Sequence, residues 1–87
     1  MSADHSIRIE YYARIREAMG CAVEDIALPT AIATAGMLVD WLRERNAEGR
    51  AAFDTRVHVA VDDMMAQATT SLDGARTIAL FPPMTGG

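Results

Sequence analysis

The sequence predicts a single α+β domain in which one long helix packs against a mixed β-sheet. The chain has 87 residues, which is enough for one hydrophobic core but not for two. Several short segments alternate apolar and polar residues with the period of half-buried strands. One segment between them, beginning at Ala35, has the helical period instead. A sheet covered by one long helix is an α+β arrangement.

The N-terminal segment predicts a strand followed by a short helix. Residues 1–5 are expected to form a short leader. The segment Ser6–Tyr12 alternates, and its predicted buried side chains are Ile7, Ile9 and Tyr11. We expect a short helix over Ala13–Met19, because Gly20 follows in a position that commonly ends a helix.

A second strand is expected over Cys21–Leu28. Its apolar anchors are Val23, Ile26 and Leu28. The alternation of apolar and polar residues is interrupted around Glu24, which indicates a strand that starts after a turn or carries a bulge. Pro29 ends this strand.

The long helix follows the N-cap candidate Thr34 and is expected to stop at Asn46. Its shared stripe consists of Leu38, Trp41, Leu42 and Arg45.

The C-terminal part predicts two strands and a turn before the last strand. The segment Arg56–Val61 alternates, with three valines facing inward and His58 and Ala60 facing outward. Asp62-Asp63 marks a turn, and Met64–Ala68 is expected to return from it as a short strand. Asp73-Gly74 is a further turn signal.

The last strand is predicted over Thr77–Phe81, with Ile78 and Leu80 on one face. Pro82-Pro83 ends it, because proline has no N–H to donate to a neighbouring strand. We therefore expect a domain over residues 1–83 and a C-terminal tail over residues 84–87.

Charge and composition exclude several classes of function. The net charge is −4, from eight arginines and twelve acidic residues, and no basic run is present. This balance argues against nucleic acid or an anionic membrane as a partner. The single cysteine, Cys21, cannot form an internal disulfide, and the N-terminus has no signal peptide pattern. We expect the protein in the cytoplasm.

The sequence contains no motif for catalysis by this chain alone. Neither a GxGxxG pattern nor a phosphate-binding loop is present. His5 and His58 are far apart and have no further ligand at metal-binding spacing, so we expect no metal and no bound cofactor. Adjacent acids such as Asp62-Asp63 are usually solvated in a turn. Cys21 is expected to be structural, because no partner that would activate its thiol lies near it in the sequence.

The C-terminus carries the functional signal. After Pro83, four residues remain, and they reach roughly 13 Å when extended. The final Gly86 and Gly87 have no side chains, so they fit a channel too narrow for other residues. A frayed terminus is the simple alternative. The functional alternative is that ATP activates the Gly87 carboxylate as an acyl-adenylate, after which a sulfur nucleophile produces a thiocarboxylate.

Several strings in the chain resemble the family of molybdopterin synthase small subunits. They are Tyr11-Tyr12-Ala13-Arg14-Ile15-Arg16-Glu17 with Gly20, the helix around Leu38 to Leu42, Val59-Ala60-Val61, and Phe81-Pro82-Pro83-Met84-Thr85-Gly86-Gly87. The last string matches the family's Phe-Pro-Pro-x-Thr/Ser-Gly-Gly ending. Asp62 departs from the family pattern, since relatives often have asparagine there. Before the last strand, either Arg76 replaces an acidic residue of the family or the register has slipped by one residue.

The resemblance implies a ubiquitin-like β-grasp fold and a role as sulfur carrier. An adenylyltransferase related to ubiquitin-activating enzymes would use ATP to adenylate Gly87, and a sulfurtransferase would supply sulfur indirectly. The tail would then enter the large subunit of molybdopterin synthase and donate sulfur to the pyranopterin precursor of the molybdenum cofactor. Family members typically form a heterotetramer with that large subunit.

The strand pattern also predicts a docking surface on the sheet face opposite the core. Tyr12, Ala60, Ala79 and Phe81 fall on this face, and Met65 is expected to join them. Arg16 is a candidate rim charge. The tail residues that would contact the partner are Pro82, Pro83, Met84 and Thr85. The simpler alternatives are half-buried aromatic rings and a solvated arginine.

Two other functions stay open at this stage. The chain could carry sulfur for another pathway, such as the synthesis of thiamine, cysteine or a secondary metabolite. It could also be a ubiquitin-like modifier that joins Gly87 to a lysine of another protein.

Overall fold

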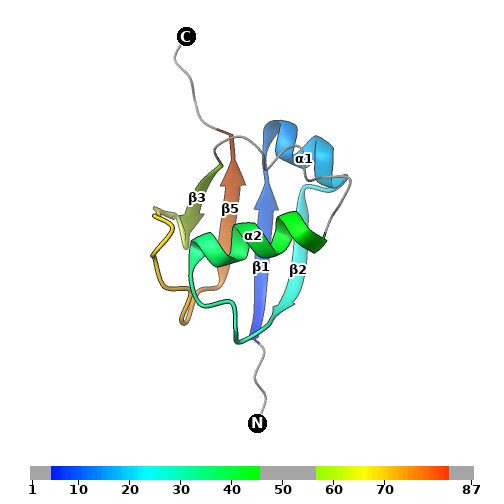
Figure 1. Cartoon of the computed structure of the whole chain (residues 1–87). Coiled ribbons are helices and arrows are strands. Elements are labelled where there is room, and N and C mark those ends of the chain that lie inside the picture. The colour runs from blue at the N-terminus through cyan, green and yellow to red at the C-terminus, as the bar shows by residue number, and fades with distance from the viewer. Residues whose placement is uncertain (1–4, 46–56, 83–87) are drawn as a thin grey trace.

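The computed structural model describes residues 5–45 and 57–82 (Figure 1). Its elements in chain order are β1 (His5–Tyr11), α1 (Ala13–Met19), β2 (Val23–Leu28), α2 (Ala35–Arg45), β3 (His58–Val61), β4 (Met64–Met65) and β5 (Thr77–Phe81). Of the expected leader over residues 1–5, residues 1–4 lie outside the described residues, whereas His5 belongs to β1, because it pairs with Leu28. The helix end at Asn46, Pro83 and the expected tail over residues 84–87 also lie outside the described residues.

The strands form one mixed sheet in the order β2-β1-β5-β3-β4. The last strand, β5, lies in the middle, parallel to β1 on one side and antiparallel to β3 on the other. The outer pairs, β1 with β2 and β3 with β4, are antiparallel. The predicted α+β architecture with a mixed sheet is therefore confirmed.

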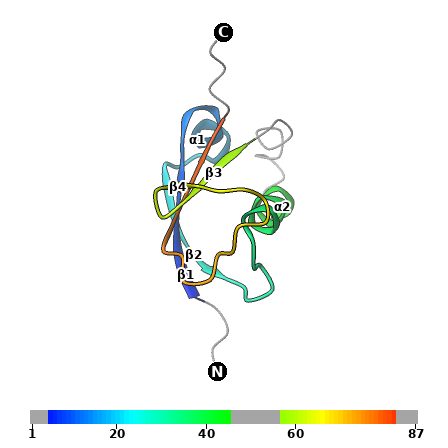
Figure 2. The ribbon, with the colours of Figure 1, turned by 90° about the vertical axis from the view of Figure 1, so that its left-hand side faces the viewer.

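The long helix α2 crosses one face of the sheet, and the hydrophobic core lies between them (Figures 1 and 2). The short helix α1 lies at the end of the sheet where β5 finishes (Figure 1). Within the described residues, no helix covers the opposite face, which we call the outer face (Figure 2). The largest fully buried side chains are Tyr11, Ile7, Ile9, Ile15, Leu28, Leu38, Leu42, Leu72, Ile78 and Leu80.

Helix α1 and strand β5 have the predicted bounds, and the other strands are shifted or shorter: β1 lies one residue nearer the N-terminus than predicted, and β3 begins only at His58. Gly20 ends α1 with a left-handed φ of 80°. The Thr34 hydroxyl accepts a hydrogen bond from the Met37 N–H at 3.3 Å, which confirms it as the cap of α2. Strand β4 is shorter than predicted, since only Met64 and Met65 pair with β3.

Strand β2 differs from its prediction. Its pairing with β1 runs without interruption from Val23 to Leu28, so the strand starts after a turn and has no bulge. Val23 is 47% exposed on the outer face, so its prediction as a buried anchor is wrong. The inward position belongs to Glu24 instead. A charged residue at an inward position obscured the alternation in the sequence.

Glu24 occupies that position because two side chains satisfy its carboxylate. The buried Tyr11 hydroxyl donates a hydrogen bond to Glu24 Oε1 at 2.7 Å, and Arg45 lies 3.5 Å from Oε2. The Arg45 guanidinium also lies over the Trp41 ring, 5.0 Å from its centroid. Burial and the bond to Glu24 raise the pKa of Tyr11, so its hydroxyl remains a donor. This network joins the C-terminal end of α2 to the sheet.

Gly36, in the first turn of α2, meets a close backbone neighbour. Its N–H donates to the Ala68 carbonyl at 2.9 Å, and a Cβ at this position would lie 3.0 Å from the Ala68 Cβ. The N–H of Ala35 likewise donates to the Thr70 carbonyl at 2.9 Å. The loop after β4 thus satisfies N–H groups that a helix start leaves free, and glycine permits this approach.

Tyr11→Phe is expected to lower the free energy of unfolding by about 1 kcal/mol, because it removes the hydrogen bond to Glu24 from a buried site. Urea denaturation measures this change. Tyr12→Phe is the matched control, since the Tyr12 hydroxyl bonds to Glu10 at an exposed position and its loss should cost less. Equal stability of the Tyr11 variant and the unaltered protein would contradict the role of this network.

Candidate functional site

The candidate site is built around the end of β5. Leu80 is fully buried, and its carbonyl accepts a hydrogen bond from the Tyr12 N–H at 3.1 Å. Phe81 is the last residue of the strand, and Pro82 follows it. The last described residues therefore belong to, or directly follow, the central strand of the sheet. The predicted site residues Pro83, Met84, Thr85, Gly86 and Gly87 lie outside the described residues.

The strand register gathers the predicted docking residues on the outer face. Ala79 pairs with Ala60, and Ala60 pairs in turn with Met65. Tyr12 and Met65 are 48% and 63% exposed, while Ala60, Ala79 and Phe81 are half-buried. We call these five residues the outer patch. Solvent-exposed apolar groups collected in this way are typical of a protein contact surface.

Part of the outer patch forms a shallow hollow at the root of the tail. Its walls are Tyr12, Ala13, Ala79, Phe81 and Pro82, all of them apolar or aromatic. The hollow lies directly beside the point where the chain leaves β5. A partner that covers it would therefore also contact the start of the tail.

His58 also lies on the outer face beside Phe81, although it is not among the site residues predicted from the sequence. It pairs with Phe81 across the sheet, and the two rings stack with centroids 5.7 Å apart and an angle of 25° between their planes. Alternation predicts that His58 faces outward. Its contact with Phe81 depends on the register between β3 and β5, which a single sequence does not reveal.

Tyr12 reaches the outer face through a sharp corner between β1 and α1. The next residue, Ala13, has a left-handed φ of 53°, which is uncommon for any residue with a Cβ and costs about 1–3 kcal/mol. The Tyr12 carbonyl accepts the Ile15 N–H at 3.1 Å and so begins the helix. The corner leaves Tyr12 half exposed while Ile15 is fully buried.

Arg16 does not join the outer patch. It lies on an exposed side of α1, and the lining of the hollow, as far as the described residues define it, does not include it. Its backbone carbonyl accepts the N–H of Gly20 at 3.0 Å, which is a structural contact at the end of the helix. Its role as a rim charge stays a prediction.

Asp62 fixes the beginning of β5 rather than standing free in its turn. Both Asp62 and Asp63 have positive φ angles, of 49° and 71°. The Asp62 carboxylate accepts hydrogen bonds from the N–H groups of Arg76 at 3.0 Å and Thr77 at 2.9 Å. These bonds hold the pKa of Asp62 below its usual range. Aspartate and asparagine both tolerate this backbone conformation, which explains why either residue suits the position.

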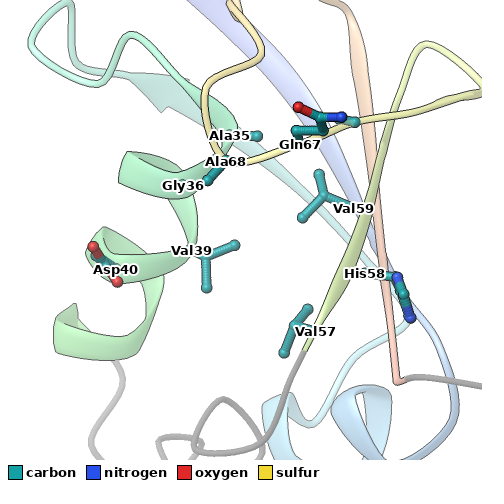
Figure 3. A pocket seen from close by; sticks show the side chains of 10 residues that line it. Ala35, Gly36, Val39, Asp40, Val57, His58, Val59, Gln67 and Ala68 are labelled. Atoms are coloured by element: carbon teal, nitrogen blue, oxygen red, sulfur yellow. The ribbon is translucent and has the colours of Figure 1, made fainter.

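A second cavity, of about 330 Å³, lies between α2 and β3 on the covered side of the sheet. Val39, Val57 and Val59 line it, while the side chains of Asp40 and His58 point away from its centre (Figure 3). The cavity therefore gathers no set of polar groups for chemistry.

Across residues 5–45 and 57–82, no three His, Cys, Asp or Glu side chains are grouped to hold a metal ion. The Cys21 thiol is free and half-buried.

The fold and the site define a class of protein: a small α+β domain whose central strand β5 is the last described element and ends beside an exposed apolar patch. The model of the ThiS family matches residues 9–87. The chain belongs to the ThiS family. No curated protein matches it significantly.

Solved structures with a similar fold include proteins of Haloferax volcanii and Pyrococcus furiosus. The HVO 2177 protein of Haloferax volcanii has a TM-score of 0.77 and 19% identity, covering 100% of this chain and 91% of that one. Small archaeal modifier protein 1 of the same organism has a TM-score of 0.73 and 21% identity, covering 95% and 100%. A protein described as molybdopterin converting factor subunit 1 of Pyrococcus furiosus has a TM-score of 0.70 and 21% identity, covering 91% and 98%.

These similarities confirm the predicted ubiquitin-like β-grasp fold. At such identities they establish the fold and leave the pathway open.

In the part of the chain that the structure describes, no helix is both long and apolar enough to cross a membrane.

Asp62→Ala is expected to lower the thermal midpoint at pH 7, because two N–H groups at the start of β5 lose their acceptor. The hydrogen bonds favour the ionised carboxylate, so their contribution is present above the ordinary aspartate pKa of about 3.9 and is lost as the pH falls through the lower pKa of the folded state. The difference between variant and unaltered protein should therefore shrink in acid. Thermal scans between neutral and acidic pH measure it.

Asp62→Asn is the matched control. It keeps an oxygen acceptor and the tolerance for positive φ, so it should retain more stability than the alanine variant at pH 7. A pH-independent difference between Asp62→Ala and the unaltered protein would contradict a contribution from the carboxylate.

Proposed function

We propose that the protein is the sulfur carrier subunit of molybdopterin synthase and that its Gly87 carries the sulfur. The observation that supports this most strongly is the ending Phe81-Pro82-Pro83-Met84-Thr85-Gly86-Gly87. Its first residue closes the central strand and lies in the outer patch. The ending therefore follows directly from an anchored strand beside a surface suited to a partner.

The loading chemistry begins at the Gly87 carboxylate, which is ionised at neutral pH and is a poor electrophile. Its oxygen attacks the α-phosphate of ATP, pyrophosphate leaves, and an acyl-adenylate forms. A hydrosulfide-equivalent sulfur supplied by a sulfurtransferase then attacks the acyl carbon. The carbon–oxygen bond to AMP breaks, AMP leaves, and a terminal thiocarboxylate remains. The adenylyltransferase supplies the active site for this step.

The unloading chemistry takes place in the large subunit. The thiocarboxylate sulfur attacks a carbon of the pyranopterin precursor, a carbon–oxygen bond at that carbon breaks, and the oxygen substituent leaves with the electron pair. Water then cleaves the acyl–sulfur bond. Sulfur stays on the precursor, and Gly87 returns as a carboxylate. Each dithiolene needs two sulfur atoms, so two loaded carriers act for each product.

The outer patch gives both partners a place to hold the domain. Because it lies at the root of the tail, a partner bound there receives the C-terminus at a fixed distance from the contact. Positioning of this kind removes much of the entropic cost of bringing the reacting groups together. The side chains of the domain then contribute recognition, while the chemistry occurs at the tail.

The identity of the acceptor distinguishes this proposal from its alternatives. Transfer of sulfur to a different acceptor would assign the chain to another sulfur pathway. Formation of an isopeptide bond between Gly87 and a lysine of another protein would make it a modifier. Both alternatives use the same acyl-adenylate, so activation alone does not separate them.

A chain that ends at Thr85 is expected to lose thiocarboxylate formation completely, with the thermal midpoint unchanged. The full chain, incubated with ATP, the adenylyltransferase and a sulfur donor, should show the mass change of one oxygen replaced by sulfur. Intact-mass spectrometry measures both proteins. A large loss of stability in the shortened chain would show that the tail packs against the domain and would contradict this account.

Phe81→Ala is expected to weaken binding to the large subunit about tenfold or more, because it removes a central aromatic anchor of the contact. The thermal midpoint should fall less than the midpoint of a core variant such as Leu80→Ala. Calorimetric titration measures the affinity. Met37→Ala is the control, since Met37 is 43% exposed on α2, on the covered side of the sheet. Equal affinity of Phe81→Ala and the unaltered protein would place the contact elsewhere.

A further inference from the structure

One carboxylate lies among the apolar groups of the outer face. Glu10 is on β1, where Arg8 and Glu10 face outward and their neighbours Ile7, Ile9 and Tyr11 face the core. The strand register places Val23 on one side of Glu10 and Ala79 on the other. Glu10 is half-buried between them, beside an alanine of the outer patch. A partner that covers this patch therefore also reaches Glu10.

A residue of the outer patch holds the carboxylate in place. The Tyr12 hydroxyl donates a hydrogen bond to Glu10 Oε1 at 2.9 Å. This bond raises the pKa of Tyr12, so the phenol keeps its proton and remains a donor. The Tyr12 side chain is thus half exposed in the outer patch, and its hydroxyl orients Glu10.

The hydrogen bond from Tyr12 does not satisfy the carboxylate completely, since an ionised carboxylate has about four acceptor positions. Arg8 is the nearest cation along the strand on the same face, and its Nε donates to Asp25 Oδ1 at 3.0 Å. A partner that covers Glu10 and excludes solvent therefore leaves an incompletely paired charge unless it brings its own donors.

We infer that the partner covers the outer patch with an apolar surface that carries one basic side chain, an arginine, placed to pair with Glu10. This inference rests on the proposed function, because it describes the partner that holds the carrier. Charge complementarity carries the argument: Glu10 is anionic and flanked by Val23 and Ala79, which supply no charge. Arginine suits the site because its planar guanidinium binds a carboxylate through two parallel hydrogen bonds and tolerates apolar surroundings.

Such a pair makes Glu10 a specificity-determining residue. A competing partner with a wholly apolar surface would fit the outer patch in shape but would bring no counter-charge of its own, and Arg8, the cation beside Glu10 on this face, is already paired with Asp25. The pair thus discriminates between partners, because a partner without a matching cation incurs the free-energy cost of burying the Glu10 charge. The sign of the effect distinguishes the two kinds of surface: removing the charge weakens binding to a basic partner and strengthens binding to an apolar one.

The test uses four versions of the full-length chain: unaltered, Glu10→Gln, Glu10→Leu and Asp40→Asn. The probe is the large subunit of molybdopterin synthase from the same organism, and calorimetric titration gives the affinity. Glu10→Gln and Glu10→Leu should each weaken binding about tenfold or more. Asp40→Asn removes the same charge from α2, on the covered side of the sheet, and should leave the affinity unchanged within about twofold. Thermal midpoints confirm that all four proteins are folded.

Equal or tighter binding by either Glu10 variant would overturn the inference and would indicate an apolar partner surface at this point. Failure of the unaltered chain to bind the large subunit would instead overturn the proposed pathway. In that case the same four proteins are titrated against the adenylyltransferase, which any sulfur carrier of this kind requires. Weaker binding of both Glu10 variants there would support the inference, and unchanged or tighter binding would overturn it.

Discussion

The position of β5 in the middle of the sheet is the constraint on which the other features depend. Ile78 and Leu80 are fully buried, and β1 and β3 pair with the strand from both sides. Asp62 fixes its beginning through two backbone N–H groups, and the N–H of Tyr12 bonds to the carbonyl of Leu80 near its end. The C-terminal ending of the chain therefore starts from a strand that is paired on both sides. The same pairing brings side chains from β3 and from the corner after β1 beside Phe81.

The sequence predicts well those features that depend on local periodicity, and less well those that depend on pairing between distant strands. Strands β1 and β5 and helix α1 follow from alternation and from Gly20. Strand β2 is partly mispredicted, because Glu24 is inward-facing and its partner Tyr11 lies on another strand. The outward direction of His58 is predictable, but its stacking on Phe81 is not, since that contact needs the register between β3 and β5. The left-handed conformation of Ala13 gives no signal in composition, because alanine seldom adopts it.

In the proposed function, recognition and chemistry are separated along the chain. The tail supplies a carboxylate and no side chain at its last two residues, whereas the domain supplies a surface of aromatic, aliphatic and thioether groups. The chain belongs to the ThiS family, and the solved structures with identities of 19–21% share its fold. In the inferred contact, the charge of Glu10 selects between partners.

The central claim is that sulfur carried on Gly87 is delivered to the molybdopterin precursor. The most direct measurement is a reconstitution with the chain as a verified thiocarboxylate, the large subunit from the same organism and the pyranopterin precursor. The account predicts molybdopterin formation, with two carriers returned to the carboxylate form for each product. An absence of product from a verified thiocarboxylate, while a known carrier is active in the same mixture, would contradict it.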